Sequence, residues 1–121
     1  MKRPVISTHL NKSLPLLRVV TRLPMRTRKK VLNELGAEKT VYKALHELAT
    51  NTLNGEIPLS KVQKRRLKPH RATLEHLCDP RSRKCAKKRR ELIVQSGGFL
   101  PIILKGLAYA LPTLLTSVLS K

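Results

Sequence analysis

Two cationic segments are the part of this sequence best suited to a chemical role, and that role is contact with phosphate. Residues 61–90 contain 13 lysines and arginines against two acids, in a chain whose net charge is +19. Cations at this density neutralise phosphates and release their condensed counterions, which gives affinity without base specificity. The cations predicted to contact phosphate are Lys61, Lys64, Arg65, Lys68, Arg71, Arg81, Arg83, Lys84, Lys87, Lys88, Arg89 and Arg90.

A glycine pair is the second feature with chemical potential. Gly97 and Gly98 follow the basic run Lys87–Arg90, and residues 99–119 after them contain a single charge, Lys105. A narrow protease channel admits an extended backbone where side chains are absent, and glycine provides this. A pair in an exposed linker is therefore a candidate cleavage site, made by Gly97, Gly98 and Phe99. The alternative interpretation is a flexible hinge or a helix stop.

The other polar residues form no recognisable catalytic or metal-binding pattern. The sequence has no glycine-rich phosphate loop, no metal-ligand pair at helical spacing and no acid pair in an apolar setting. Cys78 and Cys85, with His70 and His76, lack the paired spacing of a zinc site. We therefore expect a protein that is not an enzyme, with no cofactor and no metal. Two thiols without a disulfide framework indicate a reducing setting.

Helical periodicity indicates which elements position these residues. In 38–53, Val41, Leu45 and Leu48 form one apolar stripe at helical spacing, which predicts the clearest helix. Ser60 and Gln63 have the spacing of a capping box, so a second helix begins there and carries the first cationic segment. A helix over 26–35 and another over 81–95, after Asp79-Pro80, complete the set. We find no convincing strand pattern.

The fold class that follows is mostly α, a small helical bundle with a basic N-terminal arm, a basic helix and a hydrophobic C-terminal helix. The predicted parts are a basic arm (1–25), in which the Leu14–Val20 run forms a short helix or strand, a small helical unit (26–78), a basic helix (79–96), and a Gly-Gly hinge with a hydrophobic tail (97–121).

The apolar tail has three interpretations. Residues 99–119 are just long enough to span a bilayer, so the tail could insert into or cross a membrane. It could pack against copies of itself, or it could be the buried helix of a globular fold. The upstream helices offer little apolar surface to cover it, which favours an external partner. The residues predicted to contact a membrane or a capsid are Phe99, Leu100, Ile102, Ile103, Leu104, Leu107, Leu111, Leu114 and Leu115.

The order of these features resembles a known family. The basic run Lys87–Arg90, the pair Gly97-Gly98 and the tail start Phe99–Leu104 resemble the precursor of adenovirus core protein mu. They are also similar to small basic proteins of adenovirus-like integrating elements, the adintoviruses and Polintons. The resemblance covers roughly residues 81–115. It implies genome condensation inside a virion, and cleavage between Gly98 and Phe99 by a viral cysteine protease, with Gln95 four places before the cut.

The resulting hypothesis is a virion core protein that binds and condenses double-stranded DNA without sequence specificity and is processed after Gly98. Its expected partners are double-stranded DNA, capsid proteins or a membrane through the tail, and a viral cysteine protease. Its expected location is the virion, and the host nucleus during assembly. Two alternatives remain: a membrane-active minor capsid protein, and a ribosome-associated or other RNA-binding protein.

Overall fold

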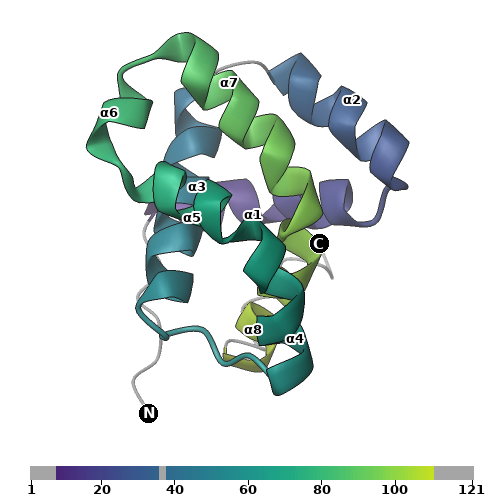
Figure 1. Cartoon of the computed structure of the whole chain (residues 1–121). Coiled ribbons are helices and arrows are strands. Elements are labelled where there is room, and N and C mark those ends of the chain that lie inside the picture. Colours follow the sequence, from purple (N-terminus) through teal and green to yellow (C-terminus); the bar gives the residue numbers. More distant parts are fainter. Residues whose placement is uncertain (1–7, 36–37, 111–121) are drawn as a thin grey trace.

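A computed structural model describes residues 8–35 and 38–110 of the chain, with side chains over 10–35 and 38–107. Within these ranges every regular element is helical, which confirms the predicted mostly α bundle (Figure 1). Buried apolar side chains from successive helices form one continuous core cluster. The two cationic segments therefore project from a folded body.

Helix α1 (Thr8–Thr21) is a core helix and not an arm. Leu10, Leu14, Leu17 and Val20 recur at intervals of four, three and three residues, so they share one helical face, and all four are fully buried. Pro15 lies inside the helix but on its exposed side, where water can reach the backbone carbonyl that loses its helical partner. The structure thus replaces the predicted basic arm with a packed helix over residues 8–21; residues 1–7 lie outside the described ranges.

Helix α3 (Lys39–Leu53) confirms the clearest sequence prediction. Val41, Leu45 and Leu48 are buried at 4% exposure or less, and the helix packs against both α1 and α5. It ends at a turn in which Gly55 adopts φ +74°, a conformation that favours glycine. Helix α3 is thereby the central element of the core.

Helices α4 (Lys61–Leu67) and α5 (Arg71–Cys78) are joined by the short 3-10 turn η1 (Lys68–His70). The predicted capping box is present: the Ser60 hydroxyl accepts from the Gln63 backbone N–H at 3.1 Å, and the Ser60 N–H donates to the Gln63 side chain at 2.8 Å. Pro69 interrupts the helix inside η1, as its missing N–H requires. Leu67 and Leu74 turn inward and fix this path to the core.

The predicted basic helix over 81–95 is divided into α6 (Pro80–Arg83) and α7 (Ala86–Gln95). Asp79 caps α6 by accepting from the Arg81 backbone N–H at 2.9 Å, and Pro80 occupies the first helical position. Helix α7 then runs beside α2 (Met25–Leu35), which matches the helix predicted over 26–35 (Figure 1).

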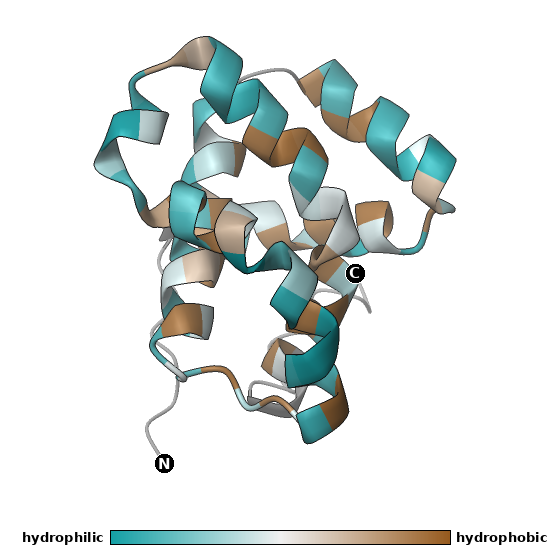
Figure 2. Cartoon of the chain, in the orientation of Figure 1, coloured by the Kyte–Doolittle hydropathy of each residue, from teal (hydrophilic) through white to brown (hydrophobic). Residues whose placement is uncertain are grey.

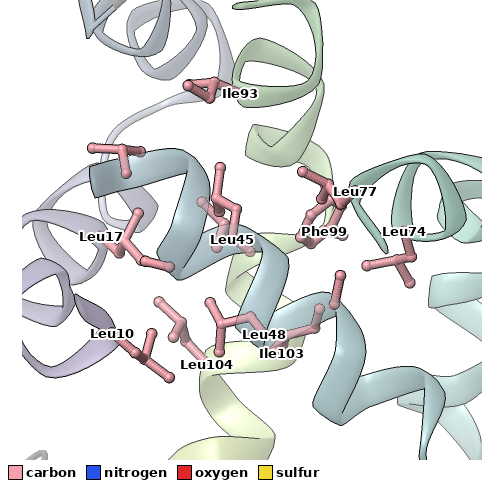
Figure 3. Close-up of a cluster of buried hydrophobic side chains, with 14 of the residues drawn as sticks. Leu10, Leu17, Leu45, Leu48, Leu74, Leu77, Ile93, Phe99, Ile103 and Leu104 are labelled. Carbon is pink, nitrogen blue, oxygen red and sulfur yellow. The ribbon is translucent and has the colours of Figure 1, made fainter. Parts of the chain in front are cut away.

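Helix α8 (Leu100–Ala110) follows a second 3-10 turn, η2 (Ser96–Gly98), and enters the core. Leu100, Ile103, Leu104 and Leu107 are fully buried, and the close-up in Figure 3 shows Leu104 beside Leu10 and Leu48. Of the three interpretations of the tail, the buried helix therefore describes residues 100–107. The apolar face of α1, which the sequence analysis had assigned to an arm, supplies the cover that the tail was expected to lack.

Candidate nucleic-acid interface

The first cationic cluster, which we call the α4 cluster, consists of Lys61, Lys64, Arg65, Lys68 and Arg71. All five side chains are exposed to solvent. The capping box defines the start of α4, and Leu67 is its buried residue, so most of the helix circumference is available to carry charge. In Figure 2 most of the α4 ribbon has the colour of hydrophilic residues. The predicted contacts of this segment are thus sterically available to a phosphate backbone.

The second cluster, the α6–α7 cluster, consists of Arg81, Arg83, Lys84, Lys87 and Arg90. These five side chains are also exposed, and Lys88 beside them is half-buried. In Figure 1 the cluster occupies the top left of the molecule, while α4 lies at the lower right. The two clusters therefore present charge at separate places on the surface.

Arg89 departs from the prediction, because it is a structural residue. Its side chain is only 9% exposed, and its Nη1 donates to the backbone carbonyl of Arg83. This hydrogen bond joins α7 to the last turn of α6 across the break at Lys84-Cys85. Burying a guanidinium is tolerated only with polar partners. We therefore assign Arg89 to holding α6 against α7 and not to contact with a duplex at the outer surface.

Two of the predicted cations form ion pairs with neighbouring acids. Arg71 pairs with Glu75 at 2.9 Å, and Arg81 pairs with Asp79 at 2.9 Å. Hydrogen bonds from the Arg81 side chain and backbone lower the pKa of Asp79 and keep it ionised. Surface pairs of this kind contribute little, so a polyanion can compete for the arginines.

A cationic hollow of about 580 Å³ contains residues that the sequence analysis missed. Its lining residues are Lys39, Tyr42, Lys43, Arg83, Lys84 and Arg89. Lys39 and Lys43 lie one helical turn apart on α3, and the fold places them opposite the α6–α7 cluster. Their spacing of four residues was a signal that they share a face. Their position across from residues 83–89 depended on the tertiary fold.

The glycine pair lies in a packed turn, whereas the prediction placed it in an exposed linker. Gly97 is buried, and its carbonyl accepts a 2.6 Å hydrogen bond from Arg28 Nη1. A Cβ on Gly97 would lie 3.0 Å from Leu32 Cδ1, and one on Gly98 would lie 2.7 Å from His70 Cε1. The glycines therefore permit close approach of α2 and η1 to this turn. They do not act as a hinge in the folded chain.

The bond predicted to be cleaved is enclosed as well. Phe99 is fully buried, and its ring meets that of His70 edge-on with centroids 6.2 Å apart. Its backbone N–H donates to the Ser96 carbonyl at 3.1 Å. A protease that needs an extended strand therefore cannot engage Gly98-Phe99 until this turn opens.

The residues predicted to contact a membrane or a capsid are mostly inside the protein. Phe99 and the α8 residues Leu100, Ile103, Leu104 and Leu107 have no exposed surface, and Ile102 packs against the same core. Leu111, Leu114 and Leu115 lie outside the described residues. Over the described ranges, none of the helices combines the length and the apolar character that crossing a bilayer requires.

The geometry offers contacts for anions, and comparison with known proteins adds no relative. Among the residues with described side chains, no group of three or more His, Cys, Asp or Glu is placed to hold a metal ion. Searches of protein-family models, of curated proteins and of solved structures found no match to this chain. The charge distribution and the fold are therefore the observations that bear on the function of this chain.

Proposed function

We propose that this chain is a non-enzymatic virion core protein that binds and condenses double-stranded DNA without reading its sequence. The observation that carries the proposal is the exposure of nearly all the predicted cations, in two separate clusters on a folded body. Arginine and lysine side chains held by helices neutralise phosphates, with arginine able to bind them in a bidentate way. The assignment to a virion, and to the host nucleus during assembly, is supported by the sequence resemblance over 81–115.

A preference for duplex phosphates over stacked single strands is supported by the placement of the aromatic rings. Single-strand binding proteins stack bases on exposed aromatic side chains. Among the described side chains, Tyr42 is 1% exposed and Phe99 is fully buried, so neither of these rings offers a stacking surface; Tyr109 lies outside the described side chains. Contacts through lysine and arginine alone favour the high phosphate density of a duplex.

Condensation, as distinct from binding, is supported by the separation of the two clusters. A protein that brings two duplexes together needs two cationic surfaces that do not compete for the same phosphates. The α4 cluster lies on α4, η1 and the first residue of α5, whereas the α6–α7 cluster lies beyond the end of α5, and Figure 1 places α4 and α6 on different sides of the molecule. One chain could therefore contact one duplex with each cluster.

A bridging assay tests this function. Energy transfer between two differently labelled duplexes reports bridging, and anisotropy of one labelled duplex reports binding. Neutralising either cluster should abolish bridging while binding to a single duplex is retained. Equal bridging by both variants and the unmodified chain, at matched binding density, would contradict the proposal. The matched variants are K61Q/K64Q/R65Q for the α4 cluster and K84Q/K87Q/R90Q for the α6–α7 cluster.

We also propose that the chain is processed between Gly98 and Phe99 by a cysteine protease of the adenovirus type. The proposal is supported by the resemblance and by the change from cationic to apolar sequence at this bond. Because the bond is packed against His70 and Phe99 is buried, cleavage would have to follow release of α8 from the core. Processing would then be coupled to a conformational opening during assembly.

A further inference from the structure

We propose that the hollow between α3 and the α6–α7 break, which we call the α3–α7 hollow, binds a compact polyphosphate. Such a ligand carries several phosphate groups within one small molecule or at the 5′ end of a nucleic acid. The hollow shares Arg83 and Lys84 with the α6–α7 cluster, but it adds Lys39, Lys43 and Arg89, so that cations from two segments face one partly open space. It goes beyond the proposed function, since duplex condensation does not need it.

The first support is the concentration of charge around one space. Five of the six lining residues are cationic: Lys39, Lys43, Arg83, Lys84 and Arg89. They come from two segments far apart in the sequence, so the fold and not a local run brings them together. Cations that share a hollow repel one another, and a multivalent anion would relieve this repulsion. A single phosphate of a duplex would neutralise only part of that charge.

The second support is the state of the nearest acids. Glu38 precedes Lys39, but its carboxylate accepts from the Thr40 backbone N–H at 2.6 Å and thereby caps α3. Asp79, the acid that precedes α6, is held by the Arg81 guanidinium. Neither carboxylate is among the lining residues; Asp79 is near enough to act on Tyr42, but its charge is paired with the Arg81 guanidinium.

The third support is the buried part of the wall. Arg89 is nine-tenths buried, and its hydrogen bond to the Arg83 carbonyl fixes the guanidinium in place. Tyr42 is held from the other side, where its hydroxyl donates to the Leu77 carbonyl at 3.5 Å. Burial raises the pKa of Tyr42, so the phenol stays neutral and adds no negative charge. A guanidinium fixed in this way provides a positive charge at a set position, and it loses less entropy on meeting an anion than a mobile surface lysine does.

The size of the hollow suits a small molecule. Ligand pockets commonly measure about 300–1,000 Å³, and this hollow of about 580 Å³ falls inside that range. A duplex is too wide to enter it, whereas a triphosphate chain or the 5′-triphosphate end of a strand could. The exposed lysines at its mouth and the buried arginine at its wall together match a ligand with several adjacent phosphates.

The test uses the full-length chain, with calorimetric titration of tripolyphosphate and of orthophosphate at constant ionic strength. One tripolyphosphate should bind per chain, much more tightly than orthophosphate. The K39Q/K43Q variant should bind tripolyphosphate about tenfold or more weakly than the unmodified chain, because it lacks two of the charge-assisted contacts. The matched control K61Q/K64Q loses the same charge from exposed positions on α4 and should change the affinity less than about threefold. Lys39 and Lys43 are both exposed, so their replacement should leave the fold intact, and circular dichroism checks this.

Equal weakening by the two double variants would overturn the proposal, since it would mean diffuse attraction to a basic protein. Binding of several tripolyphosphates per chain with no distinct first site would overturn it as well. A second arm distinguishes the two sources of ligand. Short RNA strands with a 5′-triphosphate and with a 5′-hydroxyl compete against tripolyphosphate: a selective advantage of the triphosphate strand assigns the site to nucleic-acid ends. Equal competition by the two strands assigns it to free polyphosphates.

Discussion

Gly106→Ala distinguishes a core helix from a free apolar tail. In a packed core helix the substitution should lower the free energy of unfolding, whereas in a free helix it should raise the helix propensity. Gly106 is buried in α8 against the segment that leads into α4. A Cβ at this position would lie 2.7 Å from the Pro58 backbone oxygen and 2.7 Å from Leu59 Cδ2. The contact with a backbone oxygen cannot be relieved by a change of rotamer, so either α8 or the 57–59 segment must move.

The expected change in the free energy of unfolding combines the cost of overpacking with the gain in helix propensity. Overpacking of a tight contact costs about 1–3 kcal/mol, and replacing glycine by alanine inside a helix returns at most about 1 kcal/mol. Three overlaps under 3.0 Å, one of them with a backbone oxygen, place the first term at about 2–3 kcal/mol, so we expect Gly106→Ala to destabilise the protein by about 1–2 kcal/mol. With a urea dependence of about 2 kcal/mol per molar, the middle of the usual range, this lowers the unfolding midpoint by about 0.5–1 M.

The assay is urea unfolding of the full chain, followed by far-ultraviolet circular dichroism. Lys105→Ala is the matched control, since Lys105 is the exposed neighbour on the same helix and its loss should change stability by less than about 0.5 kcal/mol. A Gly106→Ala protein that is as stable as the unmodified chain, or more stable, would refute the packing of α8 against Pro58.

Further predictions concern the core, the cap, the enclosed bond and an acid. Leu104→Ala should destabilise the protein by about 2–5 kcal/mol in the same urea assay, because the side chain is fully buried. Ser60→Ala should cost about 1 kcal/mol by removing the cap of α4, and Ser60→Asp should restore most of that loss. Cleavage after Gly98 by an adenovirus-type protease, followed by mass spectrometry, should be slow in buffer and accelerate in urea below the unfolding midpoint; fast cleavage of the folded chain would contradict the enclosed turn. Arg81 lowers the pKa of Asp79, so this group stabilises the fold above its unfolded pKa of about 3.9 and loses that effect as the pH falls through its folded value. Asp79→Asn should therefore reduce stability at pH 7 and flatten its acid dependence, and an unchanged acid profile would argue against the contact.

Local physics made several elements predictable from the sequence. The capping box of Ser60 and Gln63 needs only residues three apart, and the stripe of α3 needs only one helical face. Both are present in the structure as the sequence indicates. The exposure of the two cationic clusters was predictable for the same reason, since lysine and arginine avoid the core unless they have partners.

The errors have a common physical origin in contacts between distant segments. Pro15 and the surrounding cations favour an arm with at most a short helix or strand, whereas the structure forms a full helix α1 whose leucines are buried at helical spacing. Without α1, nothing in the sequence could cover α8, so the apolar residues of α8 were assigned to an external partner. The same error left the glycine pair in a linker, although its neighbours Leu32 and His70 come from other parts of the chain.

In the candidate site, too, the sequence predicts the local features and misses those that depend on contacts between distant segments. Charge density along 61–90 is a local property, and it identified most of the exposed cations correctly by position. The burial of Arg89 depends on the carbonyl of Arg83 across a helix break that the sequence analysis did not place. The α3–α7 hollow needs Lys39 and Lys43 beside Arg83, which only the tertiary fold reveals.

The salt dependence of duplex binding tests the central claim most directly. The observed binding constant for double-stranded DNA should fall steeply with salt, with a log–log slope of about −0.9 for each phosphate neutralised, and should be equal for duplexes of unrelated sequence. K84Q/K87Q/R90Q should make the slope shallower without creating a sequence preference. Binding that is independent of salt, strong selection of one DNA sequence, or tighter binding to double-stranded RNA of the same sequence would contradict the proposal that this chain is a sequence-independent binder of duplex DNA.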